Sequence, residues 1–325
     1  MSSTRYFAAH MTKKKAALIV AFALMLFIGA PPLWKTLRQG EPPRAFTGLS
    51  LKELSYREVG FKNDAQSIAL AGMLFVPKVE GPYPGVVIIH GSGNSHRDNF
   101  WYLSLVQHLQ AQGIAVLLPD KRGSGKSEGN WRGASMEDLA TDTEAAVHFL
   151  KFSSGLPLSK IGVIGLSQGG QIAPIVAARG SDVGFVTNVV GASLPLRDIV
   201  VYEERHNLRQ LGFLPPVADA MAQLNALYLR HVGQRGFWQA VGDFDPLPYW
   251  RQVRVPALVV LGGEDTNVPT AASVERLRSL KQDNIKLVVY PDSGHALEDP
   301  RGRGDRIFRA EALHAISGFV HQAAR

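Results

Sequence analysis

The sequence predicts an α/β protein built on a doubly wound, mostly parallel β-sheet. Short apolar or β-branched runs alternate with helical patterns over residues 55–325, and the turns between them are short. The 325 residues are 46% hydrophobic and 19% charged, which supplies enough apolar material for one sizeable core. One stretch, residues 194–254, breaks the alternation with two helical patterns and an aromatic-rich run. We therefore expect one large domain with a helical cap inserted over one end of its sheet.

The expected elements follow one another in a regular order. Strands are expected at Ser55–Phe61, Ile68–Pro77, Gly85–Ile89, Ile114–Pro119, in the run that starts at Lys160, and at Val183–Val190, Val255–Leu261 and Ile285–Tyr290. Helices are expected at Asn99–Gln112, Met136–Phe152, Gln171–Arg179, Thr270–Gln282 and Asp305–Gln322, and in the cap at Ile199–Leu211 and Val217–Val232. We expect the first two strands to be antiparallel. The alternation after them favours parallel strands joined by right-handed crossovers.

Residues 1–38 have the pattern of a membrane signal. Lys13–Lys15 precede an uncharged apolar run, Ala16–Ala30, and Trp34 follows it at the position of a membrane interface. The apolar stretch approaches the ~20 residues that cross a bilayer, and basic residues before such a stretch stay in the cytoplasm. We therefore expect residues 1–38 to be a signal anchor that holds residues 55–325 on the non-cytoplasmic side, periplasmic or extracellular.

Cleavage of this segment is the alternative. A peptidase site could end at Ala30, which would release a secreted protein, but Pro31 would then be the first mature residue, and such enzymes avoid proline there. Residues 39–54 are rich in Gly, Pro and charge, so they are expected to form a linker to the domain at 55–325.

The charge distribution argues against a nucleic-acid partner. The chain carries a formal net charge of +7, but residues 1–44 hold seven basic residues and one acidic residue, which accounts for +6 of it. The remaining 281 residues therefore carry only +1. Proteins that bind nucleic acids by charge need a basic surface on the folded domain, and this distribution does not predict one.

A serine lies between two glycines at a predicted strand-to-helix turn. The motif G-x-S-x-G, centred on Ser167, follows the β-branched run from Lys160 and precedes a helical pattern. A turn this tight gives the serine a strained backbone and leaves no space for a Cβ at Gly165 or Gly169. The serine hydroxyl would then be exposed at the carboxyl end of the sheet, beside a helix N-terminus that stabilises negative charge.

An acid and a base follow in the order that activates such a serine. Asp265 lies in the loop after one predicted strand, and His295 lies in the loop after the next. A serine hydroxyl needs an imidazole to take its proton, and the imidazole needs a carboxylate to fix its tautomer. Glu264 is the rival acid, but Asp265, four residues before Pro269, is favoured. Four other histidines lie in predicted helices, where structural roles suit them better: His108, His148, His314 and His321.

Together these motifs resemble the α/β-hydrolases, and most of all the dienelactone-hydrolase-like and prolyl-oligopeptidase-like esterases. The resemblance covers roughly residues 54–325. It includes the order Ser167, Asp265, His295, the sequence H-G-S-G after the strand that ends at Ile89, and a D-x-R-G-x-G-x-S turn that starts at Asp120. The resemblance implies a fold of the α/β-hydrolase type and a serine hydrolase activity.

The resemblance also implies an oxyanion hole made of two backbone N–H groups. One belongs to the residue after the nucleophile, which is Gln168 here. The other comes from the loop after His-Gly, where Ser92 is the first choice and Gly93 the alternative. Such donors are worth about 3 kcal/mol each in the transition state.

No sequence motif calls for a cofactor or a metal. The sequence at 125–127 resembles the end of a phosphate-binding P-loop, but Asp120 occupies the position of its first glycine. Similarly, His96 stands where the third glycine of a dinucleotide fingerprint belongs. No histidine pair has the spacing of a zinc helix, and the chain has no cysteine for a thiolate site.

The cap allows two interpretations of its aromatic residues. They fasten the cap to the body, or some of them line an acyl or aromatic pocket; the residues concerned are Phe237, Trp238, Phe244, Tyr249 and Trp250. Three cap arginines, Arg197, Arg205 and Arg209, could receive a substrate carboxylate, although a solvated helix face is the favoured interpretation.

The expected function is hydrolysis of a carboxylic ester through an acyl-enzyme on Ser167, with a small-molecule acyl substrate. Hydrolysis of a thioester or a short peptide comes next. An acyltransferase would use the same three residues with an acceptor other than water. A degenerate hydrolase that acts as a binding module is the non-enzymatic alternative. The sequence leaves the acyl group, the leaving group and the oligomeric state open.

Overall fold

The computed structural model describes residues 18, 29–30, 33–35, 49–180, 182–300 and 308–325. Its centre is one eight-stranded sheet with the order β1-β2-β4-β3-β5-β6-β7-β8. The first strands pair antiparallel, β1 with β2 and β2 with β4, and all later neighbours are parallel. The predicted doubly wound, mostly parallel sheet with an antiparallel start is therefore confirmed.

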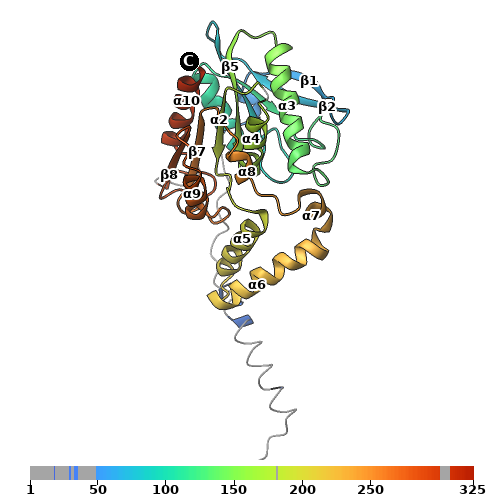
Figure 1. The fold of residues 1–325 in the computed structure, drawn as a ribbon, viewed down its shortest axis with the longest axis vertical. Helices are drawn as coiled ribbons and strands as arrows, with labels where there is room; N and C mark the ends of the chain where they lie inside the picture. The colour runs from blue at the N-terminus through green and yellow to red at the C-terminus, as the bar shows by residue number, and fades with distance from the viewer. Residues whose placement is uncertain (1–17, 19–28, 31–32, 36–48, 181, 301–307) are drawn as a thin grey trace, which may run out of the picture.

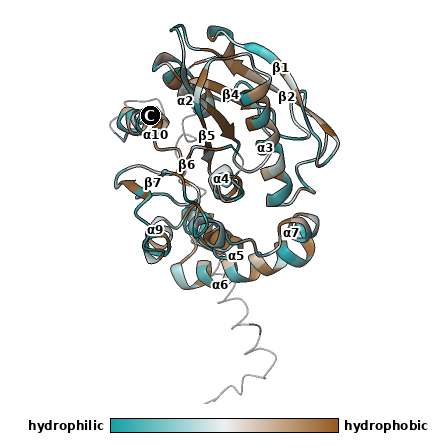
Figure 2. Cartoon of the chain, turned by 45° about the horizontal axis from the view of Figure 1, so that its top comes forward, coloured by the Kyte–Doolittle hydropathy of each residue, from teal (hydrophilic) through white to brown (hydrophobic). Residues whose placement is uncertain are grey.

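The strands lie close to their predicted positions. They are β1 (Arg57–Asn63), β2 (Ile68–Phe75), β3 (Tyr83–Ile89), β4 (Ala115–Pro119), β5 (Leu158–Leu166), β6 (Phe185–Val189), β7 (Ala257–Gly262) and β8 (Ile285–Tyr290). The central strands are buried over almost their full length, as expected for a parallel sheet covered on both faces. Hydrophobic colours accordingly concentrate on the central strands in Figure 2, whereas the edge strand β1 is largely hydrophilic.

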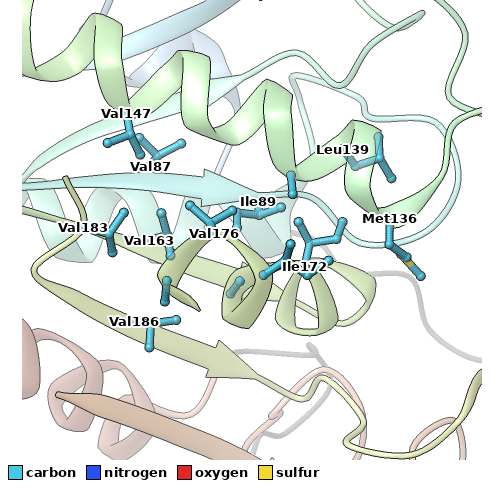
Figure 3. Packing of buried hydrophobic residues seen from close by; sticks show 14 of the residues in the cluster. Val87, Ile89, Met136, Leu139, Val147, Val163, Ile172, Val176, Val183 and Val186 are labelled. Atoms are coloured by element: carbon cyan, nitrogen blue, oxygen red, sulfur yellow. The ribbon is translucent and has the colours of Figure 1, made fainter. Parts of the chain in front are cut away.

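Helices cover both faces of the sheet. On one face lie α2 (Phe100–Ala111) and α10 (Ala310–Ala324), and on the other lie α3 (Met136–Phe152), α4 (Gln168–Ala178) and α9 (Thr270–Ser279). Figure 3 shows the second layer from close by, with Val147 of α3 above Val87 of β3 and with Ile172 of α4 beside Ile89. The two faces bury separate apolar clusters, so the sheet is the shared wall of a three-layer core.

Several helix boundaries differ from the predictions, and two of these differences have a clear structural reason. Helix α4 begins at Gln168, directly after Ser167, and not at Gln171, because the tight turn feeds the chain straight into the first helical turn. Helix α10 begins at Ala310, since Phe308 is paired with Glu298 in an isolated bridge and is buried. The part of the predicted helix at 305–307 lies outside the described residues.

The predicted cap forms between β6 and β7. It contains α5 (Leu196–Gln210), α6 (Pro215–Tyr228) with a following π-helical turn η2 (Leu229–Gly233), α7 (Arg235–Val241) and α8 (Leu247–Trp250). In Figure 1, α5, α6 and α7 lie to one side of the sheet and its covering helices. The aromatic-rich run, to which the sequence assigned no helix, therefore forms the two short helices α7 and α8.

Most of the cap aromatics fasten the cap to the body. Trp238 and Trp250 are buried within the α3–α4 side of the core, and Phe244 stacks on Tyr249 with ring centroids 5.8 Å apart. Phe237 is only partly buried and remains at the edge of this cluster. The first interpretation is therefore confirmed for Trp238, Trp250, Phe244 and Tyr249, and the second stays a prediction.

The stretch before the sheet packs partly on the body. A single 3₁₀ turn, Leu51–Glu53, has a capping box from Ser50, and Leu49 and Leu54 contact the α2–α10 side of the core. Nearly all of the predicted signal segment at 1–38 lies outside the described residues. Of the helices in the described part of the chain, none has the length and hydropathy to cross a membrane.

Phe185 of β6 is expected to be a large contributor to the stability of this fold. Its side chain is fully buried, it meets Phe319 of α10 edge-on at 6.2 Å, and it lies against Gly162, where an added Cβ would overlap its ring. Phe185→Ala should lower the free energy of unfolding by about 3–5 kcal/mol, through lost burial and the cavity left behind. Urea denaturation followed by circular dichroism measures this change.

Phe152→Ala is the matched control, because that phenylalanine at the end of α3 is 60% exposed. Its effect should stay within about 0.5 kcal/mol. Equal losses in the two variants would contradict the assignment of Phe185 to the core.

Candidate active site

Ser167 lies at a tight turn whose backbone leaves no space for a side chain at Gly165 or Gly169. It follows β5 and precedes α4 with φ 54° and ψ −118°, a conformation that is strained for any residue with a side chain. A Cβ at Gly165 would overlap the carbonyl oxygen of Gly169, and a Cβ at Gly169 would overlap that of Ile89. The amide of Ser167 donates to the carbonyl of Val189 at 2.9 Å and so holds the turn against β6. The predicted strained turn is therefore present.

Three predicted residues from separate loops form one hydrogen-bonded series. His295 Nε2 lies 3.0 Å from Ser167 Oγ, and His295 Nδ1 lies 2.8 Å from Asp265 Oδ2. Ser167, Asp265 and His295 come from the carboxyl ends of β5, β7 and β8, which meet at one edge because these strands are parallel. With Nδ1–H donating to the carboxylate, Nε2 is left to accept the serine proton.

The loop after β7 orients the carboxylate of Asp265. Its Oδ1 accepts the backbone N–H groups of Asn267 and Val268, both at 2.8 Å, and the residue is 2% exposed. Glu264, the rival acid, is exposed, and its backbone N–H donates to the carbonyl of Ser293. The structure therefore brings Asp265 to His295.

The loop after β3 faces Ser167 from the other side. Gly91 approaches Ser167 so closely that a Cβ there would lie 3.3 Å from the serine Cβ, and its N–H donates to Tyr102 Oη at 2.8 Å. Ser92 and Gly93 follow and line the same cavity as Ser167. Gln168 lines it too, as the first residue of α4, where backbone N–H groups lack partners within the helix. Both predicted oxyanion positions therefore border the serine.

Lys121, which sequence reasoning passed over, lies behind these residues. Its Nζ donates to the carbonyl of Gly91 at 2.8 Å and to Gln168 Oε1 at 2.9 Å. The side chain is largely buried, and this burial lowers the pKa of Lys121 to about 8. The only signal in the sequence was a lysine inside the D-x-R-G-x-G-x-S turn.

The rest of that turn has a structural role. Asp120 accepts from the Nε and Nη2 atoms of Arg97 at 2.9 and 2.7 Å, which ties the turn to the loop after β3. Arg122 pairs with Asp142 of α3 at 2.6 Å. A Cβ at Gly125 would lie 2.5 Å from the Asp120 carboxylate, so the glycine leaves space for this ion pair. These contacts therefore fix the backbone of the turn that carries Lys121.

His90, at the end of β3, is buried and does not join the series. Its Nε2 contacts the carbonyl oxygen of Pro119 at 2.6 Å. Burial lowers the pKa of His90 to about 4, so the ring is neutral in ordinary buffers. The helical histidines that were set aside also lie elsewhere: His108 contacts Ser317, and its ring lies 5.0 Å from that of His314. Among the described residues, no group of three or more acids and histidines could hold a metal.

Ser167 and His295 line a cavity of about 1170 Å³ between the sheet edge and the cap. Its wall includes Trp101 and Tyr102 of α2, and Phe237 of α7. Trp101 also fixes the histidine loop, because its Nε1 donates to the carbonyl of Ala296 at 3.1 Å. The cavity is wide enough for a small organic substrate and is partly apolar.

The charged residues of this cavity are not those that the sequence singled out. Arg205 and Arg209 of α5 pair with Asp219 at 2.9 and 3.0 Å and do not line the cavity. Arg132 and Arg235 line it, and the guanidinium of Arg132 lies 4.7 Å from the centre of the Trp131 ring. Arg132 lies in a loop and Arg235 is the first residue of α7, and no local sequence pattern reveals that either residue lines the cavity.

Comparison with known proteins decides the family. The model described as the alpha/beta hydrolase family matches residues 86–307, which is more than half of the chain. The chain belongs to the alpha/beta hydrolase family. The match includes most of the strand before Gly91, the turn at Ser167 and the loops of Asp265 and His295, so the predicted resemblance is confirmed.

This chain is also similar to individual proteins. It is 24% identical over 270 residues to esterase EstD of Thermotoga maritima, an alignment that covers 79% of the chain and 65% of EstD. It is 26% identical over 308 residues to the human acylamino-acid-releasing enzyme, covering 86% of the chain and 38% of that enzyme. The chain thus spans less than two thirds of the length of these relatives.

Among solved structures, the esterase Pf2001 of Pyrococcus furiosus resembles this chain in fold. The TM-score is 0.63 at 19% sequence identity, and the superposition covers 88% of this chain and 98% of the esterase chain. At this level of identity the likeness concerns the fold alone.

Proposed function

We propose that this hydrolase cleaves a carboxylic ester through an acyl-enzyme on Ser167. The observation that carries the proposal is the hydrogen-bonded series from Ser167 through His295 to Asp265, open to a cavity of about 1170 Å³. Esterases among the relatives, EstD in particular, support an ester as the substrate. The activity test is hydrolysis of a panel of esters, thioesters and aminoacyl amides by the full chain.

The first half of the reaction forms the acyl-enzyme. Ser167 Oγ attacks the acyl carbonyl carbon while His295 Nε2 takes the hydroxyl proton, and the carbonyl π electrons move to oxygen. Asp265 holds the imidazole in the tautomer with Nδ1–H and stabilises the imidazolium. His295 then gives the proton to the leaving alkoxide, and the carbon–oxygen bond of the ester breaks. An alcohol leaves and the acyl group remains on Ser167.

The second half repeats these steps with water. His295 removes a proton from water, the resulting hydroxyl attacks the acyl carbonyl, and Ser167 leaves with the proton returned by His295. In both halves the negative oxygen lies between the N–H groups of Gln168 and Ser92, which are each worth about 3 kcal/mol in the transition state. Water reaches the acyl group through the open cavity.

Hydrolysis of short peptides is a second candidate. The human acylamino-acid-releasing enzyme and dipeptidyl aminopeptidase BIII of Pseudoxanthomonas mexicana, 26% identical to this chain, support it. The chain covers only 38% and 34% of these proteins, so the support concerns the shared part. An amide needs the same attack but a stronger proton transfer to its nitrogen, and aminoacyl amides in the panel separate the two.

Acyl transfer and thioester hydrolysis use the same acyl-enzyme and differ in acceptor or leaving group. Partitioning of the acyl group between water and added alcohols or amines distinguishes a transferase from a hydrolase. A binding module that has lost catalysis would show no turnover on any member of the panel, and the intact series at Ser167 argues against it.

Labelling by a fluorophosphonate tests the nucleophile. The native protein should be labelled on Ser167 alone, because the reagent needs a serine that an imidazole activates. Ser167→Ala should lower kcat by about 10⁴- to 10⁶-fold, with the residual rate coming from the oxyanion hole and binding. Peptide mapping and turnover assays check both results. Labelling at another residue, or full turnover by the variant, would refute the proposal.

Paired substitutions test the acid and the base. His295→Ala should be about as harmful as Ser167→Ala, and Asp265→Asn should be equally harmful or milder, because the residues act as a unit. Combining two of the changes should add little. Glu264→Gln is the matched control, since Glu264 is adjacent but exposed, and kcat should barely change. A larger loss in Glu264→Gln than in Asp265→Asn would reverse the assignment.

The cap should select the substrate without supplying chemistry, and Phe237 is the residue to test. It lines the cavity, whereas Phe244 packs on Tyr249 away from it. Phe237→Ala should change KM and acyl-chain preference by roughly 10- to 200-fold, the range for apolar contacts, while labelling of Ser167 persists. Phe244→Ala is the control and should leave acyl preference as it was. Loss of labelling in a folded Phe237→Ala variant would mean that the cap holds a group needed for reaction.

A membrane tether is the second part of the proposal. The sequence of residues 1–38 supports an anchor with the hydrolase domain on the non-cytoplasmic side. Expressed in a bacterium, the full chain should remain with membranes in high salt and at alkaline pH, because apolar residues and not charge hold it there. Recovery of a soluble form that begins near Pro31 would instead favour a cleaved signal.

A further inference from the structure

The ammonium group of Lys121 lies between the two segments that the proposed reaction uses to hold the oxyanion. It donates to the carbonyl of Gly91, the residue before Ser92, at 2.8 Å. It also donates to the side-chain oxygen of Gln168, the residue after Ser167, at 2.9 Å. One side chain therefore joins the loop after β3 to the first turn of α4.

This charge is buried without a carboxylate partner among the described residues. Lys121 is 8% exposed, and the neighbouring Asp120 is engaged by the guanidinium of Arg97. The ring of Trp131 is also close, with its centre 5.5 Å from Nζ. A lone buried charge is costly for folding, so a methionine of similar length would satisfy packing at lower cost. A lysine at this position therefore indicates a role that needs the positive charge and the N–H donors of the ammonium group.

We propose that Lys121 is a positioning residue of the oxyanion hole. Its two hydrogen bonds fix the spacing between Ser92 and Gln168, whose N–H groups receive the oxyanion, and its charge makes this side of the cavity more positive. Donors that are fixed before reaction need no reorganisation when the negative oxygen forms, and this is where such sites gain most of their effect. The inference rests on the proposed function.

A pH dependence follows from the surroundings of the amino group. The titratable and charged groups near it are His90 at the end of β3, the Asp120–Arg97 pair, Tyr102 of α2, which contacts Gly91, and Asp142 of α3, which lines the same small pocket and pairs with Arg122. Burial keeps His90 neutral with a pKa of about 4 and raises the pKa of Tyr102 to about 12, so neither changes charge between pH 7 and 9. Burial lowers the pKa of Lys121 to about 8. As pH rises through this value the charge is lost, and kcat should fall.

The test compares Lys121→Met and Lys121→Arg with Lys126→Met. Lys126 belongs to the same turn, but it pairs with Glu58 at the surface and its side chain is 63% exposed, so its variant should keep native kcat. Lys121→Met should lower kcat by about 10- to 100-fold, less than removal of an oxyanion donor itself, with KM little changed. Lys121→Arg should recover part of the loss. The alkaline decline of kcat near pH 8 should be present in the native protein and absent in Lys121→Met.

Gln168→Leu tests the same link from its other end. It removes the side-chain acceptor of Lys121 and keeps the backbone N–H, so it should lower kcat as Lys121→Met does, and the double variant should be no worse than Lys121→Met alone. If Lys121→Met does not fold, as judged by circular dichroism, Gln168→Leu decides alone. Native kcat in Gln168→Leu together with native kcat in a folded Lys121→Met would overturn the proposal.

Fluorophosphonate labelling separates the two levels of inference. Failure to label Ser167 in the native protein would remove the proposed function. Labelling of the native protein, combined with equal labelling rates in Lys121→Met and the native protein, would remove only the role of Lys121. Slower labelling in Lys121→Met than in Lys126→Met is the expected result.

Discussion

The close approach of β3, β5 and the first turn of α4 is the constraint on which the rest of the site depends. Gly165 and Gly169 allow the backbone of the turn to touch itself, and a Cβ at Gly169 would overlap the carbonyl of Ile89. This contact puts the end of β3 beside the end of β5, which is also where the strand order of the sheet changes direction. Ser167 and the loop at Gly91 face one another because the strands leave no space between them.

The strain at Ser167 is sustained by the same contact. A serine with φ 54° would relax in an isolated turn, but here its N–H is held by Val189 and its carbonyl accepts from Gly170 at 2.8 Å. The surrounding core opposes relaxation, since β6 and residues 161–166 of β5 are buried. The strained turn at Ser167 therefore depends on the packing of the large apolar core around it.

Most strands of the sheet, and the series of Ser167, His295 and Asp265, could be predicted because short stretches of sequence mark them. Alternating runs mark the strands, and Ser167, Asp265 and His295 each follow a strand, so a parallel sheet brings them together. Lys121 could not be predicted this way. Its partners Gly91 and Gln168 lie 30 and 47 residues away in sequence, and their meeting depends on the packing of three loops. Helix α7 was not predicted because its aromatic residues pack against the core of the body, and this tertiary contact leaves no periodic pattern in the local sequence.

Hydrogen bonds connect the cap to the loop that carries Asp265, so the position of the cap affects the orientation of this acid. Tyr202 of α5 donates from its hydroxyl to the carbonyl of Asp265 at 2.8 Å, and Glu203 accepts from the side chain of Asn267 at 2.8 Å. Asn267 in turn donates its backbone N–H to the Asp265 carboxylate. A displacement of α5 would therefore act on the orientation of the acid, while Phe237 of α7 shapes the cavity. Within one insertion, α5 therefore both supports the acid loop and lines the cavity, and α7 lines the cavity as well.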